Sequence, residues 1–181
     1  MGKSEGVNTT VSTFEDLQVA RDWIALIEGE PGRIREQDIY PRIKAWSEGF
    51  KPPEVLEIGC GQGICSQQLS SAARQYTGVE LSVPLLARAQ QLYSGPERKF
   101  ILGSALALPF PTGRFAGAFS VTVWFLLSDI KQASRELSRI LMPGGQFLIL
   151  TANPQGYANW TSRYTHSKIE GRRFEGRVTR V

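Results

Sequence analysis

Residues 55–63 read VLEIGCGQG, a short apolar run followed at once by three alternating glycines. The run is typical of a buried strand, and a helical pattern begins near Ile64. Glycine suits the turn between them, because the backbone must bend sharply and approach a ligand where a Cβ would obstruct it. The start of the helix adds unpaired N–H groups and the positive end of a dipole. This stretch predicts a strand–turn–helix unit that binds a ligand.

The same alternation continues toward the C-terminus. Further strands are expected at residues 76–80, 100–102, 119–123 and 147–151, and helices at residues 64–73, from Pro84 onward and from a cap at Asp129 to Leu141. Strands that alternate with helices are typical of βαβ units, whose parallel sheet is buried on both faces. The sequence predicts an α/β fold with a Rossmann-like, doubly wound, mostly parallel sheet and flanking helices.

The first 50 residues have a different character. They contain two helical patterns, at residues 11–28 and 34–46, before a boundary at residues 51–53 (KPP). Pro41 lies inside the second pattern, where its ring and missing N–H should kink or divide the helix. We expect these residues to form a helical cap segment.

Composition and charge narrow the classes of function. The 181 residues are about one domain, without an apolar run long enough to cross a membrane or an apolar signal segment at the N-terminus. Cys60 and Cys65 match neither a disulfide framework nor a zinc ligand set, so we expect reduced thiols, a cytoplasmic location and no metal. Residues 163–181 carry six bases and two acids, and the other residues fifteen of each. Without a basic stripe on the body, nucleic acid is not an expected partner, and the tail is either solvated or bound to an anionic partner.

Two classes of cofactor use a glycine turn between a strand and a helix. The dinucleotide fingerprint has its third small residue at the sixth position, which is Ile64 here. In this sequence the third glycine, Gly63, comes one residue earlier. That spacing, with Glu57 before it, resembles motif I of class I S-adenosylmethionine-dependent methyltransferases of the type 11 group. A nucleotide-dependent oxidoreductase is the less favoured alternative.

Three later landmarks extend the resemblance over residues 23–154. Glu80 lies 21 positions after Gly59, at the end of the second expected strand, where a carboxylate can accept the ribose hydroxyls. Residues 108–111 (LPFP) and 139–146 (RILMPGGQ) resemble the family's loop after strand three and its turn into strand five. The implied cofactor is S-adenosylmethionine, and the implied product is S-adenosylhomocysteine.

The resemblance also implies which residues bind the cofactor. They are Glu57, Gly59, Cys60, Gly61 and Gly63 near the methionine part, Glu80 at the ribose, Leu81 on the adenine, Ser104, Ala105 and Leu106 at the adenine edge, and Ser120 and Thr122 beside the sulfonium. Ser104 stands where the family usually has aspartate. Its hydroxyl can accept the adenine amino hydrogen without charge assistance, so the backbone at residues 105–106 should carry more of that recognition. Cys60 and Cys65 are expected to pack rather than to react.

The resemblance implies methyl transfer by in-line displacement, in which positioning supplies much of the rate. No catalytic residue can be named. His166, the only histidine, is either a base or a surface residue. No acceptor signature is present, and the family branch favours a small organic molecule. The aromatic candidates for its pocket, which otherwise belong to the core, are Trp23, Tyr40, Trp124, Tyr157 and Trp160.

The expected organisation has three parts: a helical cap segment at residues 1–50, a cofactor-binding Rossmann-like core at 51–152 and a basic C-terminal segment at 153–181. The family's sheet has the strand order 3-2-1-4-5-7-6, and too few residues follow Thr151 for the complete strand 6–7 hairpin. We therefore expect a truncated form. In a complete chain, the apolar edge of the strand at residues 147–151 would instead be covered by the terminal segment, a partner or a second copy. A non-catalytic S-adenosylmethionine-binding or regulatory subunit is the alternative to an enzyme.

Overall fold

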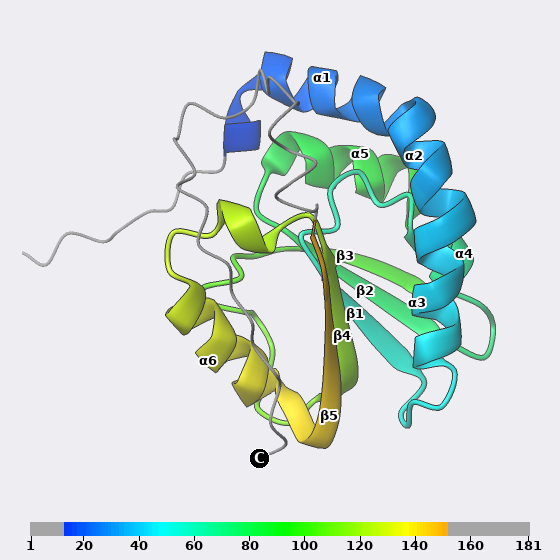
Figure 1. Ribbon diagram of the computed structural model, residues 1–181, viewed down its shortest axis with the longest axis vertical. Helices are drawn as coiled ribbons and strands as arrows, with labels where there is room; N and C mark the ends of the chain where they lie inside the picture. Colours follow the sequence, from blue (N-terminus) through cyan, green and yellow to red (C-terminus); the bar gives the residue numbers. More distant parts are fainter. Residues whose placement is uncertain (1–12, 152–181) are drawn as a thin grey trace, which may run out of the picture.

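A five-stranded parallel sheet forms the centre of the computed structural model, which describes residues 13–151 (Figure 1). Its strands are β1 (Glu54–Ile58), β2 (Gln75–Glu80), β3 (Arg98–Leu102), β4 (Phe115–Val121) and β5 (Leu141–Leu150). Their order is β3-β2-β1-β4-β5, and every neighbouring pair is parallel. The chain thus winds outward from β1 in both directions. The predicted doubly wound Rossmann-like sheet is confirmed.

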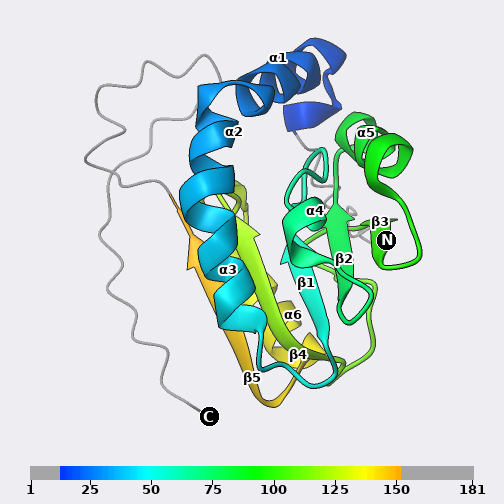
Figure 2. The same cartoon turned by 90° about the vertical axis from the view of Figure 1, so that its right-hand side faces the viewer.

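Helices cover both faces of this sheet. They are α1 (Leu17–Glu28), α2 (Glu30–Ile34), α3 (Tyr40–Ser47), α4 (Ser66–Leu69), α5 (Val83–Tyr93) and α6 (Ile130–Ile140), with short turns η1 (Thr13–Glu15), η2 (Arg35–Ile39) and η3 (Trp124–Leu126). Figure 2 shows α3, α4 and α5 on one face and α6 on the other. The helices α1 and α2 lie across the end of the sheet where the strands finish, above the connection from β1 to α4.

Alternation along β1 divides the core in two. Val55 packs on the face of α3 and α4 with Tyr76 and Phe119, whereas Leu56 packs on the face of α6 with Phe115. These side chains are fully buried. Because successive side chains of a strand point to opposite faces, Glu57 falls on the same side as Val55, inside an apolar layer.

Near Pro41 the hydrogen-bond pattern of the helix changes, whereas the backbone stays helical from Glu30 to Ser47. The segment splits into α2, a π-helical turn over Arg35–Ile39, and α3, which carries Pro41 in its first turn. The N–H of Tyr40 donates to the carbonyl of Arg35, the wider hydrogen bond of a π-turn. Proline clashes with the carbonyl four residues before it, and a widened turn relieves that clash.

Three expected boundaries were wrong. The helix predicted at residues 64–73 is a single turn, α4, because Ser70 is extended and residues 71–74 close a tight turn. The strand predicted at residues 119–123 spans Phe115–Val121. Within it, Gly117 makes room for the ring of Phe50, and the strand ends before Thr122, which has a left-handed backbone. The expected turn at residues 143–145 is an irregularity in the pairing of β4 with β5, not a break before β5.

Within residues 13–151, none of the helices is long and apolar enough to cross a membrane. Both cysteines are buried free thiols. The expected basic C-terminal segment, and with it His166, Tyr157 and Trp160, lies outside the described residues.

Candidate functional site

The glycine loop between β1 and α4 is shaped by close contacts. Gly59 has a φ of 75°, and a Cβ there would overlap the side chain of Val123 from the loop after β4. Gly63 has a φ of 82°, and its Cβ would lie 2.8 Å from Cε1 of Phe100 and 2.9 Å from Cβ of Ala89. Side chains are therefore excluded by conformation and by space together. The loop lies across the ends of β1, β2 and β4.

Glu80, at the end of β2, faces this loop and is itself buried. Its Oε2 accepts the N–H of Gly61 at 2.8 Å, and its Oε1 accepts the N–H groups of Leu81 and Ser82 at 2.9 and 2.8 Å. Burial raises the pKa of Glu80, and these three hydrogen bonds act against the rise. A carboxylate has about four acceptor sites, so three backbone bonds leave room for one more donor. The structure thus brings three of the predicted site residues together: Glu80, Gly61 and Leu81.

Glu57 lies beneath the loop, on the face of α3 and α4. Its carboxylate accepts a short hydrogen bond from the Tyr76 hydroxyl. Burial raises its pKa to about 7, while the Tyr76 hydrogen bond and the nearby charge of Arg35 lower it. The same burial raises the pKa of the Cys65 thiol, so Cys65 is held as a neutral thiol, as expected for a packing residue.

The other predicted cysteine and serine of this region are also buried. Cys60 packs so closely on β2 that a Cβ at Gly78 would lie 2.7 Å from its Sγ. Ser120, near the end of β4, is fully buried, and its Oγ has no hydrogen-bond partner among the described residues.

The helical cap supplies a residue that the sequence did not single out. Arg35, the first residue of the π-turn, donates from Nη2 to Oγ1 of Thr122 at 3.0 Å. Its guanidinium carbon lies 5.4 Å from the ring centroid of Trp23. Thr122 follows β4 with a φ of 59°, rare for a residue with a side chain, and its hydroxyl donates to the carbonyl of Val121 at 2.7 Å. No local pattern in the sequence signals Arg35, because its partner Thr122 lies 87 positions away.

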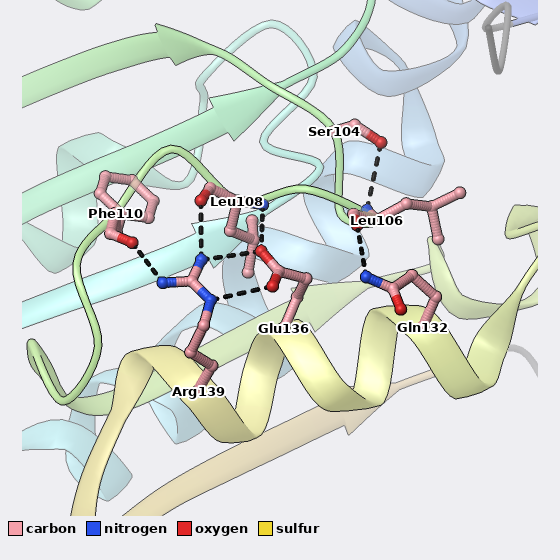
Figure 3. Close-up of polar contacts among 7 residues, drawn as sticks. All are labelled: Ser104, Leu106, Leu108, Phe110, Gln132, Glu136 and Arg139. Carbon is pink, nitrogen blue, oxygen red and sulfur yellow. Dashed lines mark hydrogen bonds and ion pairs between the residues drawn. The ribbon is translucent and has the colours of Figure 1, made fainter. Parts of the chain in front are cut away.

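The loop after β3 is held from the opposite face by three side chains of α6 (Figure 3). They are Gln132, Glu136 and Arg139, spaced so that they share one side of the helix. Arg139 donates to the carbonyls of Leu108 and Phe110, Glu136 accepts the Leu108 N–H, and Gln132 donates to the carbonyl of Leu106. Hydrogen bonding to Arg139 lowers the pKa of Glu136. The predicted adenine-side residues therefore lie on a braced loop.

Ser104 begins this braced loop. Its Oγ accepts the N–H of Leu106 at 3.1 Å, and Ala105 lies between them, partly buried. A hydroxyl has a second lone pair and its own proton, so Ser104 can still bind a ligand. Of the aromatic candidates, Trp23 lies at the site beside Arg35. Tyr40 is buried in the core, and the Trp124 ring packs 5.0 Å from that of Phe147.

These residues fit S-adenosylmethionine. The loop has positions where a Cβ has no space, Glu80 has an acceptor site left for a ribose hydroxyl, and Arg35 offers a cation to a carboxylate. The cofactor has each matching group: an amino-acid end, a ribose and an adenine. Among the described residues, no group of three or more His, Cys, Asp or Glu side chains could hold a metal ion.

Comparisons with known proteins identify the family of this chain. The family described as "Methyltransferase domain" matches residues 56–149, more than half of the chain. A malonyl-[acyl-carrier protein] O-methyltransferase of Pseudescherichia vulneris is 29% identical over 128 residues, 68% of this chain and 49% of that protein. A demethylmenaquinone methyltransferase of Thermus thermophilus is 32% identical over 107 residues, 57% of this chain and 49% of that protein. The chain thus spans about half the length of these curated relatives.

Solved structures share the fold. The YcgJ protein of Bacillus subtilis is 26% identical with a TM-score of 0.56, and the match covers 61% of this chain and 48% of that one. The arrangement of the five strands and their flanking helices is therefore one that crystal structures already contain.

Proposed function

Because this chain belongs to the methyltransferase domain family of class I S-adenosylmethionine-dependent enzymes, we propose that it binds S-adenosylmethionine and transfers the methyl group to a small-molecule acceptor. One observation carries the proposal. The glycine loop after β1 faces Glu80 after β2, and Gly61 donates directly to that carboxylate. Ligands of open α/β sheets bind beyond the carboxyl ends of the strands, which is where these two segments meet.

Each end of the cofactor has candidate residues. Glu80 accepts a ribose hydroxyl, and residues 104–106 hold the adenine edge through Ser104 and the backbone. The glycine loop contacts the methionine part, above Glu57. The cofactor, when bound, supplies a methyl group on a sulfonium from which a neutral thioether leaves. The residues of the chain bind and orient it, and such positioning is worth several kcal/mol of the barrier. We assign no general base.

The acceptor class rests on the relatives. Their names specify a malonyl-[acyl-carrier protein] and a demethylmenaquinone, that is, a carboxylic acid and a quinone. A screen of acceptors therefore begins with apolar carboxylic acids and reduced quinones, followed by phenols and amines. The two free thiols support a reducing, cytoplasmic setting for this activity.

Calorimetric titration tests the cofactor. We expect S-adenosylmethionine and S-adenosylhomocysteine to bind in the micromolar range and NAD not to bind. Binding of NAD alone would favour the oxidoreductase, and binding of none of them would refute the proposal. Glu80→Ala should weaken binding at least tenfold, the effect of losing one charged hydrogen bond. Unchanged affinity in that variant would refute the ribose assignment alone.

Transfer of radiolabelled methyl groups tests the reaction. A positive acceptor should give labelled product and S-adenosylhomocysteine in equal amounts. Tight cofactor binding with no product from any acceptor class would favour the non-catalytic, regulatory alternative.

A further inference from the structure

The helical cap carries a cation directly beside the glycine loop. Arg35 donates a hydrogen bond to the hydroxyl of Thr122. The next residue, Val123, has the side chain that a Cβ on Gly59 would meet. The guanidinium on the cap and the glycine turn of β1 are therefore separated by one residue of the loop after β4. The charge of Arg35 also reaches the buried Glu57 beneath the loop.

Within the described part of the chain, Arg35 forms no ion pair with a carboxylate, although its charge acts on the buried Glu57. The ion pairs there join Arg88 to Glu28, Arg114 to Glu54 and Arg139 to Glu136. Arg35 instead contacts neutral groups: the hydroxyls of Thr122 and Tyr40, and the ring of Trp23. A guanidinium has five N–H donors, and these contacts use only some of them.

Two features fix the direction of Arg35. The π-turn begins at this residue, and such turns are frequent at functional sites because they re-aim a side chain within a helix. The guanidinium carbon lies over the ring of Trp23, 5.4 Å from its centroid, and Arg35 is partly buried. A charge that is partly desolvated gains more from an opposite charge than an exposed one does.

The chemistry of the proposed cofactor then selects its partner. S-adenosylmethionine carries two positive groups, the sulfonium and the ammonium, and one negative group, the carboxylate. Because the cofactor already carries two positive groups, a guanidinium beside it is unfavourable unless the guanidinium faces the carboxylate. We propose that Arg35 binds the carboxylate of the cofactor's amino-acid end and so joins the helical cap to the bound cofactor. This inference rests on the proposed function.

The test uses two ligands that differ only at this end. S-adenosylhomocysteine has the amino-acid end, and 5′-methylthioadenosine has the same nucleoside and a thioether without it. Calorimetry on the full chain compares wild type with Arg35→Gln, Arg35→Lys and the control Arg33→Gln, which removes an exposed charge from the same cap.

We expect Arg35→Gln to weaken S-adenosylhomocysteine binding about 10- to 100-fold, the range for a hydrogen bond to a charged group. Its affinity for 5′-methylthioadenosine should change less than twofold. Arg35→Lys should fall between, because lysine keeps the charge without the planar fork. Arg33→Gln should resemble wild type with both ligands.

Each other result has a definite meaning. Equal losses for both ligands would show that Arg35 only holds the cap in place, and unchanged affinity for both would show that the carboxylate binds elsewhere. Either overturns the assignment while leaving the proposed function intact. Failure of the wild type to bind either ligand would refute the proposed function and this inference with it. Circular dichroism of each variant identifies any loss of fold.

Discussion

At the scale of single residues, the buried carboxylate of Glu57 gives the folded chain a pH dependence. The folded chain keeps the Glu57 proton up to a pKa of about 7, because burial disfavours the charge, whereas the unfolded chain releases it near 4.5. Between these values the folded state binds more protons, so the free energy of unfolding falls as pH rises. The stability that the folded chain gains by keeping this proton is fully present below pH 4.5 and is lost above pH 7.

Glu57→Gln should remove this decline. The amide oxygen can still accept the Tyr76 hydroxyl hydrogen, but it carries no charge at any pH. We expect urea unfolding to show a free-energy advantage of the variant over wild type that grows from pH 5 to pH 8 by on the order of 2 kcal/mol. The exposed Glu30→Gln serves as control and should follow the wild-type curve. If the free energy of unfolding of Glu57→Gln changed with pH in parallel with that of wild type, the pH dependence would not come from Glu57.

Site residues with contacts close in the sequence could be predicted, whereas those whose contacts are far apart in the sequence could not. The glycine loop and Glu80 were predictable because a tight turn directly after a strand leaves a local signature in glycine spacing. Arg35 left none, because its partner Thr122 is 87 positions away and meets it only once the cap has packed. The left-handed backbone of Thr122 was equally invisible, since threonine does not favour that conformation.

At the scale of elements, α6 braces the loop after β3. Arg139→Ala leaves the carbonyls of Leu108 and Phe110 without these donors and frees the loop that carries Ser104. We expect a lower urea midpoint and roughly 2- to 10-fold weaker binding of S-adenosylhomocysteine and 5′-methylthioadenosine alike, because both contain adenine. An equal loss of affinity for both ligands distinguishes Arg139→Ala from Arg35→Gln, which should weaken the binding of S-adenosylhomocysteine alone.

The controls for this brace lie on the same helix. Arg135→Ala, which removes an exposed charge from α6, should match wild type in midpoint and in affinity. Arg139→Lys should resemble Arg139→Ala rather than wild type, since one ammonium cannot span two carbonyls and a carboxylate with the geometry of a fork. Unchanged ligand affinity in Arg139→Ala would show that the contacts of α6 with this loop do not contribute to cofactor binding.

The strand β5 is the element for which we propose a partner. Within the described residues it pairs only with β4, and Ile149 on it is 41% exposed. An unpaired edge with apolar side chains tends to pair with another chain. We expect light scattering to show a dimer that dissociates on dilution. The substitution Ile149→Lys should weaken this dimer. Leu92→Lys, an equally exposed position on α5, should not weaken it. A wild-type monomer at every concentration would contradict self-pairing.

At the scale of the whole molecule, we propose that residues 13–50 act as a cap that is joined to the rest of the chain by the core packing of α3 and by polar contacts such as those of Trp46 with Gln146 and Ser47 with Arg74. Beyond Arg35, the carbonyl of Ile24 accepts from Gln62 at 3.3 Å, and that of Phe14 accepts from Ser82 at 2.7 Å. The Arg88–Glu28 ion pair is exposed and contributes little. Sequence predicted this cap as helices but not its position, because no local pattern specifies which end of the sheet it covers.

A cofactor that contacts both cap and sheet should stabilise them together. At 100 times its dissociation constant, S-adenosylhomocysteine should add about 2.7 kcal/mol to the free energy of unfolding, and raise the melting temperature by roughly 5–11 °C. Amide hydrogen exchange should slow in α1 and in the glycine loop, whereas α6, on the far face, should change little. In Arg35→Gln the protection of α1 should disappear while that of the glycine loop persists, because the loop binds the cofactor without the cap. Protection confined to the loop in wild type as well would show that the cap does not take part in binding.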